Sequence, residues 1–347
     1  NLLIIVESQI EIESITFINP DKTELELKVN DLKVAKDINM EFDQEYIVKI
    51  KTKDGKEEIR KLVENSEENI KNVEELVSFR DKVNSGLTYT GKTINLIEDI
   101  DLSSICGENI NGETISFKPI GYNSNFEGIF DGRNHTIKNI FINESSGNSA
   151  LFANIANNEI KNLKLNNGNI KGGAYTGGIC AISTSSIIYN CINNVKIEGG
   201  SHCTGGIAGY AINTIIENCA NMSDINGTMR AGGIVGATEG NCKILKSYNK
   251  GNISSKSTGS GDGTYMSAGI CAGTGCNKGS EFIIENCYNV GDIYGKTHTS
   301  GIYTRPAGGG NHRISNCYST GKLTGNYRYA ISGFYDSYRG TPNMILN

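Results

Sequence analysis

The chain of 347 residues is long enough for two domains and a large buried interior. Its 42 glycines, 4 prolines and lack of tryptophan indicate a chain that turns often, which excludes a fold built mainly from long helices. The formal net charge of −5 argues against a surface for nucleic acid or for anionic membranes.

Residues 1–64 are predicted to form a small β module of the immunoglobulin-like sandwich type. Leu25, Leu27 and Val29 alternate with charged residues, which is the period of a half-buried strand. Asp54-Gly55 supplies a tight hairpin turn. The first hundred residues also hold 14 of the 33 basic and 22 of the 38 acidic side chains. This concentration of charge marks a domain boundary before the rest of the chain.

An apolar run opens the module and consists of Leu2, Leu3, Ile4, Ile5 and Val6. We interpret it as a strand that packs within its own module, in preference to the end of a removed apolar leader. The alternative use of such a strand is addition to the sheet of a neighbouring molecule, which would build a filament. The run is therefore the candidate polymerisation segment.

Residues 65–90 contain the one amphipathic helix that the sequence predicts. Asn72 is the expected N-cap, and Glu75 three residues later completes a capping box. Leu76 and Phe79 fall on one face of this helix. In front of a repeat array such a helix has a physical role, because the first coil would otherwise expose apolar interior and unpaired strand edges. We interpret it as an N-terminal cap.

Residues 91–347 are organised around a repeat. One column of small or apolar residues recurs at a step of 28 over four coils and at steps of 40 and 30 afterwards. A fixed period of this size indicates one supersecondary unit stacked on itself. The column consists of Leu163, Cys191, Cys219, Ser247, Cys287 and Cys317, and a Gly-Ile pair keeps pace with it at Gly178, Gly206, Gly233, Gly269 and Gly301.

Stacking of this unit predicts a solenoid lined by equivalent side chains of successive coils, each rising about 4.8 Å. In the coil around Cys219, Ile216 and Ile225 are expected to point inward and Ala220 outward. Parallel crossovers of this kind are right-handed. The predicted fold class is all-β: a right-handed parallel β-helix over residues 91–347, preceded by the capping helix and the small sandwich-like module.

The ten cysteines are expected to be reduced fillers of the interior. A column that also accepts Leu163 and Ser247 requires a small or apolar side chain, and free cysteine serves as one. Cys271 and Cys276 are the pair most open to a local bridge. The sequence has no Cys-x-x-Cys pair and its four histidines are scattered, which argues against a zinc site. Neither a metal nor a cofactor is expected.

Asparagines stand directly before this column in most coils and are expected to form a ladder, each side-chain amide bonding to the coils above and below. The paired glycines before each isoleucine let the chain pass a corner where no side chain would fit. The ladder positions are Asn162, Asn190, Asn218, Asn286 and Asn316.

Two segments carry a resemblance to known proteins. Asn84–Leu102 and Pro119–Ile140 resemble a segment of many surface proteins of Gram-positive bacteria and Bacteroides. The Gly-Gly-Ile-Val-Gly and Asn-Cys-x-Asn elements that follow are similar to the GLUG repeat of immunoglobulin A proteases and adhesins. The resemblance implies an extracellular right-handed β-helix but little about activity. The His-Glu-x-x-His zinc motif of proteases does not occur in the sequence.

The acidic residues do not form a recognisable catalytic set. β-Helices that cleave polysaccharides need carboxylates clustered on one outer face. The candidates do not share one column with basic neighbours, so catalysis is not expected. These candidates are Asp131, Glu198, Asp224, Asp262 and Asp292, and the arginines expected at solvated corners are Arg230, Arg305, Arg313 and Arg328.

The candidate binding surface is the column of Tyr248, Tyr288 and Tyr318, which follow the cysteine column directly in the last coils. Stacked, exposed aromatic rings suit sugar rings or a protein partner. The competing interpretation is that the rings only stack on one another or lie beneath a loop.

These observations predict a non-catalytic extracellular structural or adhesion protein of the cell surface that presents a rigid β-helix. Its expected partner is a host or cell-surface glycan or protein, and neither a nucleic acid nor a membrane span is expected. One alternative is a subunit of a self-assembling surface filament or pilus, joined through its N-terminal strand. A second is a carbohydrate-active β-helix enzyme.

Overall fold

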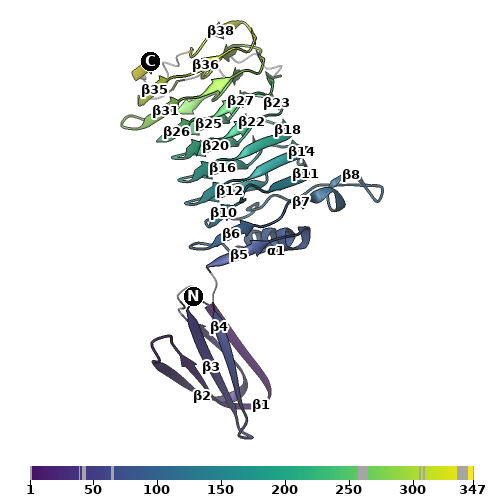
Figure 1. Ribbon diagram of the computed structural model, residues 1–347, viewed down its shortest axis with the longest axis vertical. Helices are drawn as coiled ribbons and strands as arrows, with labels where there is room; N and C mark the ends of the chain where they lie inside the picture. Colours follow the sequence, from purple (N-terminus) through teal and green to yellow (C-terminus); the bar gives the residue numbers. More distant parts are fainter. Residues whose placement is uncertain are drawn as a thin grey trace. The chain divides into compact units, whose positions relative to one another are not determined.

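The computed structural model describes residues 2–38, 40, 44–63, 66–256, 265–304, 306–307, 309–333 and 343–346. The chain divides into two compact units, Asn1–Glu68 and Asn69–Asn347. Figure 1 shows an antiparallel sheet in the first unit and a stack of short parallel strands in the second. Each unit is described by itself.

The N-terminal unit is one four-stranded antiparallel sheet in the order β2-β1-β3-β4. Ile12, Ile15 and Val48 are buried in its core, and Val6 and Val34 from the far ends of β1 and β2 pack against them. The register of β1 against β2 shifts between Glu7 and Ser14, which bends both long strands. The unit therefore has a sandwich-like core, built from one bent sheet and not from the two sheets of an immunoglobulin domain. Its strands are β1 (Leu2–Ile18), β2 (Glu24–Ile38), β3 (Glu45–Thr52) and β4 (Glu57–Val63).

Helix α1 (Val73–Asn84) closes the start of the solenoid core. The Asn72 side chain accepts a hydrogen bond from the Glu75 amide at 2.9 Å, which confirms the predicted N-cap. The Glu75 carboxylate reaches back to the Lys71 amide at 2.8 Å, one residue before the position expected for a capping box. Phe79 is fully buried, with its ring 5.4 Å from that of Phe126. The apolar face of the helix thus continues the interior of the first coils.

The second unit is a parallel β-solenoid of about nine turns, as predicted. One ten-stranded sheet runs along it and receives a strand from each coil. Its strands are β5 (Glu67–Ile70), β6 (Thr93–Leu96), β10 (Ile129–Asp131), β13 (Glu159–Lys161), β17 (Ile187–Tyr189), β21 (Ile215–Glu217), β26 (Cys242–Leu245), β31 (Glu281–Glu285), β35 (Asn311–Ser315) and β39 (Asn343–Leu346).

A twelve-stranded sheet forms a second wall of the solenoid. In the earlier coils one long strand crosses this wall, and in the later coils the same path is divided into two short strands. Its members are β7 (Ile100–Asp101), β11 (Thr136–Asn143), β14 (Lys164–Lys171), β18 (Ile192–Glu198), β22 (Ala220–Asn221), β23 (Ile225–Gly227), β27 (Tyr248–Asn249), β28 (Ile253–Ser255), β32 (Tyr288–Asn289), β33 (Ile293–Gly295), β36 (Tyr318–Ser319) and β37 (Leu323–Thr324).

Two smaller sheets complete the coil, and the unit also contains a two-stranded hairpin and a 3-10 turn. The five-stranded sheet contains β12 (Phe152–Ala156), β16 (Cys180–Thr184), β20 (Ala208–Ile212), β25 (Val235–Glu239) and β30 (Thr274–Gly275). The six-stranded sheet contains β15 (Tyr175–Thr176), β19 (Cys203–Gly205), β24 (Arg230–Gly232), β29 (Met266–Ala268), β34 (His298–Ser300) and β38 (Tyr327–Tyr329). The hairpin is β8 (Gly107–Ile110) with β9 (Glu113–Ile115), and the turn is η1 (Leu102–Ser104).

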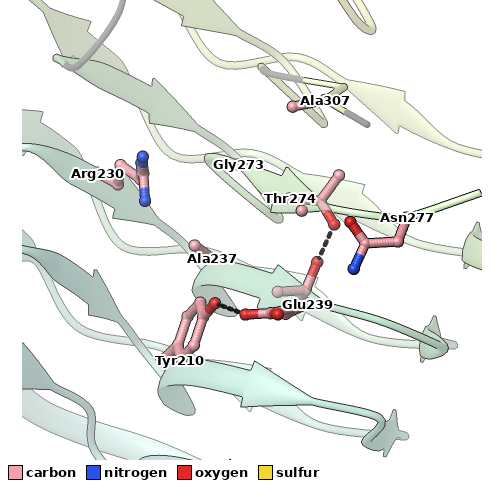
Figure 2. A pocket seen from close by; sticks show the side chains of 10 residues that line it. Tyr210, Arg230, Ala237, Glu239, Gly273, Thr274, Asn277 and Ala307 are labelled. Carbon is pink, nitrogen blue, oxygen red and sulfur yellow. Dashed lines mark hydrogen bonds between the residues drawn. The ribbon is translucent and has the colours of Figure 1, made fainter. Parts of the chain in front are cut away.

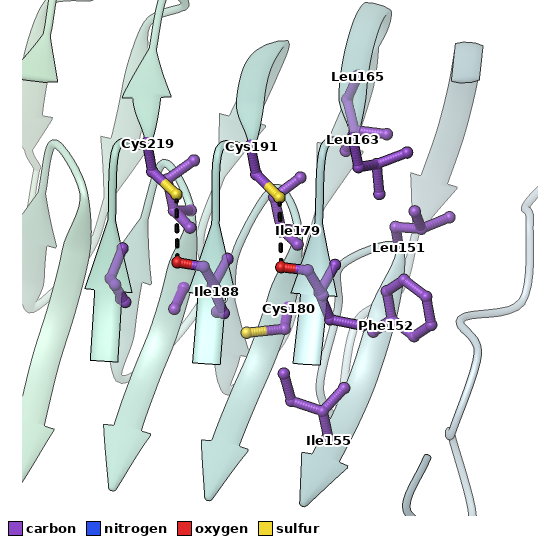
Figure 3. Packing of buried hydrophobic residues seen from close by; sticks show 14 of the residues in the cluster. Leu151, Phe152, Ile155, Leu163, Leu165, Ile179, Cys180, Ile188, Cys191 and Cys219 are labelled. Carbon is purple, nitrogen blue, oxygen red and sulfur yellow. Dashed lines mark hydrogen bonds between the residues drawn. The ribbon is translucent and has the colours of Figure 1, made fainter. Parts of the chain in front are cut away.

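The predicted cysteine column lines the interior. Cys191 and Cys219 are fully buried, and their thiols donate weak hydrogen bonds to the carbonyls of Ile160 and Ile188 (Figure 3). The serine of this column, Ser247, accepts a hydrogen bond from the Cys219 amide at 3.0 Å. All ten cysteines are free thiols, as predicted, and nine of them are buried.

The pair expected to be open to a local bridge is unbridged. Cys271 and Cys276 are both buried free thiols. Burial raises the pKa of Cys271 to about 12 and that of Cys276 to about 11, so both thiols remain protonated at neutral pH. They act as small apolar fillers of the interior, like the other cysteines.

The predicted asparagine ladder lies at a corner of the coil, and we call it the corner column. The Asn190 amide donates to the Asn162 side chain at 2.8 Å, and the Asn218 amide donates to Asn190 at 3.1 Å. All three residues have a left-handed backbone, with φ between 50° and 54° for Asn190 (52°), Asn162 (53°) and Asn218 (54°). Asparagine tolerates this conformation better than other non-glycine residues. Asn286 and Asn316 share this backbone conformation, with φ of 56° and 52°. Among the described residues, the ladder of side-chain hydrogen bonds does not extend to these two asparagines, which corrects the prediction for them.

A second asparagine column runs through the interior, and we call it the inner column. It consists of Asn193, Asn221, Asn249 and Asn289, all with no exposed surface. Each side-chain amide donates to the next residue of the column, at 2.8, 2.7 and 2.7 Å, and the last donates to Ser319 at 3.1 Å. Each also donates to a backbone carbonyl two residues further on. This column was not among the sequence predictions.

The inner column explains why the Gly-Gly-Ile element needs its second glycine. A Cβ atom placed on Gly206 would lie 2.3 Å from the carbonyl oxygen of Gly233 and 2.5 Å from the side chain of Asn221. The glycine therefore gives the buried amide its room, in agreement with the predicted absence of space at this corner.

Candidate ligand-binding face

The three tyrosines singled out from the sequence are brought together on the outside of the twelve-stranded sheet. Tyr248, Tyr288 and Tyr318 pair in register through β27, β32 and β36. Their ring centroids are 4.8 and 5.2 Å apart, with interplanar angles of 0° and 4°. The rings stack on one another, as one interpretation expected, yet the surface of Tyr318 is 53% exposed. Both interpretations therefore describe part of the arrangement.

The tyrosines belong to a regular outward grid. Side chains alternate between buried and accessible along the coils of Tyr248 and Tyr288, and between half-buried and exposed along the coil of Tyr318, so every second residue points outward. Successive coils lie about 4.8 Å apart and successive outward residues about 7 Å apart. We call this grid the tyrosine face, and its rows are Tyr248, Lys250, Asn252 and Ser254; Tyr288, Val290, Asp292 and Tyr294; and Tyr318, Thr320, Lys322 and Thr324.

The middle of the tyrosine face is polar and held by short hydrogen bonds. The backbone N–H of Asn252 donates to the Asp224 carboxylate at 2.8 Å, and the backbone N–H of Asp292 donates to the side-chain oxygen of Asn252 at 3.0 Å. The Lys322 amide continues this pattern to Asp292 at 2.8 Å. A shallow groove of about 170 Å³ lies over these residues and is bordered by Tyr294, which is 49% exposed.

Two electrostatic features concern the tyrosines of this face. The Lys250 ammonium group lies 5.4 Å from the centre of the Tyr248 ring, within the range of a cation–π contact. Burial, together with the neighbouring phenols, raises the pKa of Tyr288, so its hydroxyl stays protonated at neutral pH. The face thus offers aromatic planes beside neutral and charged hydrogen-bonding groups, which suits a sugar or a protein surface.

The aromatic character is confined to the last coils. The same outward column holds Lys164, Ile192 and Ala220 in the earlier coils. Ala220 is buried, although an outward position was expected, because its single methyl group lies between the larger Ile192 and Tyr248 of the adjacent coils. The solenoid therefore has one backbone architecture with two different outer surfaces.

The candidate acidic residues are held mainly in structural hydrogen bonds. Asp131 accepts from the Arg133 amide and from the Asn162 side chain, and Glu198 pairs with Lys196 at 3.1 Å. Asp224 and Asp292 each accept a backbone amide of the next coil. Asp262 lies outside the described residues. Within the described ranges, no three His, Cys, Asp or Glu side chains gather as a metal site.

The arginines expected at solvated corners have different environments. Arg328 is exposed, and Arg313 is half-buried beside Glu285 at 3.6 Å. Arg305 lies outside the described residues. Arg230 instead lines a pocket and has a buried Nε atom, which corrects the expectation for this residue.

The candidate polymerisation segment lies within strand β1. Leu2, Leu3, Ile4, Ile5 and Val6 pair in antiparallel register with β2. Pairing of β1 with β3 begins only at Ile12. Among the described residues, the first part of β1 therefore has a strand on one edge alone, and its role in polymerisation stays a prediction.

The fold defines the class of this protein as a parallel β-solenoid. Residues 200–226 match the family described as the GLUG motif, which confirms the resemblance drawn from the sequence. Within the described part of the chain, no helix has the length and apolar character needed to span a bilayer.

A solved structure supports this fold. A candidate immunoglobulin A1 protease from Bacteroides ovatus superposes with a TM-score of 0.54 at 20% identity, over 80% of this chain and 83% of that one. A second structure, named IgA1 protease, matches with a TM-score of 0.49 at 15% identity and covers 99% of this chain but 29% of its own. No curated protein matches the chain. At these identities the likeness describes architecture alone.

Proposed function

We propose that the chain is a non-catalytic extracellular protein of the cell surface, with a structural or adhesive role, and that the tyrosine face binds a host or cell-surface glycan or protein. The observation that carries this proposal is the in-register stack of Tyr248, Tyr288 and Tyr318 on the outside of a rigid parallel sheet. A stack of aromatic rings that remains partly accessible is suited to the apolar face of a sugar or to a protein surface.

The geometry favours binding because the side chains of the tyrosine face are already ordered before a ligand binds. Tyr248 and Tyr288 have a paired strand on either side, and Tyr318 stacks on Tyr288 from the edge strand β36. Few rotamers are therefore lost on association. Asn252, Asp292 and Lys322 lie across the same face and present hydrogen-bonding groups beside the rings. Such preorganisation is the advantage of presenting a surface on a solenoid.

The non-catalytic part of the proposal rests on the acidic residues. Asp224 and Asp292 are the two candidate carboxylates that come near one another, and both accept backbone amides from the next coil. Such bonds occupy a carboxylate oxygen and fix the side chain in one orientation, which does not suit the role of an acid catalyst that must reach a substrate. The solved relatives named as proteases leave an enzymatic role as the competing hypothesis.

Binding to a glycan array and to immobilised host surface proteins tests the proposal. We expect Tyr288→Ala to weaken the binding found for the wild type at least tenfold, because it interrupts the stack at its centre. Tyr189→Ala is the matched control, since Tyr189 is an exposed tyrosine of β17 on another sheet. Equal losses in both variants, or release of unsaturated or reducing sugars from a bound glycan, would contradict the proposal.

A second candidate function is favoured by the edge of β1. Residues 2–7 pair with β2 on one side, and on the other side no described strand covers them. A strand from another molecule could add there and build a surface filament or pilus. Electron microscopy and sedimentation at increasing concentration would show fibres, and an excess of a peptide copying residues 2–7 should suppress them. A single species at every concentration excludes this function.

A further inference from the structure

A second pocket lies away from the tyrosine face, where the five-stranded and six-stranded sheets meet. Residues of β20, β24, β25 and β30 line it, and it encloses about 90 Å³ (Figure 2). This volume suits one small polar group rather than a whole sugar ring. We call it the Arg230 pocket, and its polar lining consists of Tyr210, Arg230, Thr238, Glu239, Thr274 and Asn277.

Arg230 brings unused hydrogen-bond donors to this pocket. Its Nε atom is buried and has no hydrogen-bond partner among the described residues. One terminal nitrogen lies 3.8 Å from the sulfur of Cys203, which is a weak acceptor. A guanidinium group carries five N–H donors, and leaving a buried one unmet is unfavourable unless a ligand meets it. The arrangement therefore indicates an acceptor that comes from outside the chain.

Glu239 does not supply that acceptor. Its carboxylate accepts a hydrogen bond from the hydroxyl of Tyr210, as Figure 2 shows. Burial, together with this carboxylate, raises the pKa of Tyr210, so the hydroxyl keeps its proton. Although Arg230 and Glu239 line the same pocket, the described residues contain no ion pair between them within 4.0 Å. A positive and a negative group thus remain separated by the space that they border.

The opposite side of the pocket adds further polar groups. The Thr238 hydroxyl donates to the Thr274 hydroxyl at 2.6 Å, which leaves the proton of Thr274 free to donate elsewhere. Asn277 is exposed at the rim and carries an amide. Beside the pocket, the ring of Tyr210 stacks on that of Tyr175 at 5.3 Å. The site therefore combines a guanidinium group, a hydroxyl donor, an amide and a flat aromatic wall.

We propose that the Arg230 pocket binds the carboxylate of a small ligand whose neighbouring hydroxyl or amide N–H donates to Glu239. The planar fork of Arg230 matches a carboxylate in a bidentate manner. Glu239 selects for a donor next to that carboxylate and disfavours a second negative charge. An acidic sugar residue and the C-terminus of a peptide both present this chemistry, and the experiment separates them.

Titration of the wild type by calorimetry or nuclear magnetic resonance tests the proposal without any mutation. Glucuronate and N-acetylalanine are the two carboxylates, and glucose and N-acetylalanine amide are their uncharged counterparts. We expect at least one carboxylate to bind tenfold or more tightly than its counterpart, and the pair that shows this difference identifies the source. Equal binding within both pairs, or no binding of either carboxylate, would overturn the proposal.

Variants locate the site. Arg230→Met should weaken binding tenfold or more, whereas Arg313→Met, which removes a half-buried arginine elsewhere on the solenoid, should not. Glu239→Gln should reduce, several-fold, the preference for a carboxylate with a neighbouring hydroxyl or N–H over propionate, because a neutral amide accepts from that donor less strongly than a carboxylate. The variant can still accept from Tyr210. A merely structural role would weaken both kinds of ligand alike, so an unchanged preference in Glu239→Gln counts against the proposal, even if Arg230→Met fails to fold.

The site is independent of the tyrosine face. Tyr288→Ala should leave carboxylate binding unchanged, and Arg230→Met should leave binding at the tyrosine face unchanged. Failure of one proposal therefore does not carry the other with it.

Discussion

The inner column and the corner column are built from the same residue at the same step, but they solve different physical problems. Asn221 is fully buried, and its amide meets one side chain and one carbonyl. Asn218, three residues earlier, is exposed at a corner with a φ of 54°. Inside, asparagine satisfies buried polar groups. At the corner, it tolerates a left-handed backbone. A repeated residue type therefore marks a constrained position without identifying the physical constraint.

The largest effect is expected from Asn221→Leu. This substitution leaves the carbonyl of Ser223 and the side chain of Asn249 without their donor inside the solenoid. Each buried group left unsatisfied costs about 1–3 kcal/mol, so we expect a loss of about 3–5 kcal/mol in the free energy of unfolding. Chemical denaturation followed by circular dichroism measures it. A cost no larger than that of a change at Asn218 would erase the distinction between the columns.

A smaller loss of stability is expected in acid, because a buried histidine inside the last coils resists protonation. His312 is buried against Tyr303, and burial lowers its pKa from 6.5 to about 4. Above pH 6.5 the ring is neutral in both states. As the pH falls from 6.5 towards 4, the unfolded chain binds the proton first, so stability is lost.

This loss should reach about 1–3 kcal/mol at pH 4. His312→Gln should flatten the curve of unfolding free energy against pH between 6.5 and 4, whereas the control His202→Gln, at an exposed histidine, should not. Parallel curves for the wild type and His312→Gln would show that this ring does not titrate as its burial requires.

Cys219→Ser tests an interior position at which a serine should be tolerated. The next residue of the same column is already a serine, and Ser247 donates to the Leu245 carbonyl at 2.8 Å. A serine at position 219 can donate in the same way to the backbone carbonyl of Glu217, which lies 3.3 Å from the Cys219 sulfur. We expect a change of about 1 kcal/mol or less. A cost as large as that of Asn221→Leu would mean that the column is not interchangeable.

The smallest effect is expected from glycine at the corner position Asn218. Asn218→Gly keeps the left-handed backbone and loses one exposed hydrogen bond, from the Asn218 side chain to that of Asn190. The free energy of unfolding should therefore fall by about 0.5 kcal/mol. Asn218→Ala cannot adopt that backbone without strain and should cost about 1–2 kcal/mol. Thermal unfolding of the two variants side by side measures the difference. Alanine matching glycine would refute the conformational explanation of this column.

Much of the solenoid could be predicted from the sequence because its period is visible in single residues. The step between Cys191 and Cys219 predicts which residues stack, and alternation around them predicts the inward positions of Ile216 and Ile225. The inner asparagines keep the same step two residues later, so the signal was present. It was missed because a buried asparagine looks like a turn residue until its partners are known.

Other features depend on contacts that a repeat does not encode. The neighbours of Arg230 in the chain, Met229 and Ala231, do not distinguish a pocket from an exposed corner, and only the packing of β20, β25 and β30 around it makes a pocket. The N-terminal sheet is bent by a register shift that alternation alone does not reveal. The tyrosine face was predicted as a column, but its extension to Tyr294 was not.

Exchange of side-chain amide protons tests the central distinction most directly. In a nuclear magnetic resonance experiment on deuterated protein, the amide protons of Asn221 and Asn249 should exchange slowly and show cross-relaxation to each other, because they stack inside the solenoid. Those of Asn218 should exchange rapidly with solvent. Equally fast exchange at all three positions, without contacts between Asn221 and Asn249, would contradict the interior that this account describes.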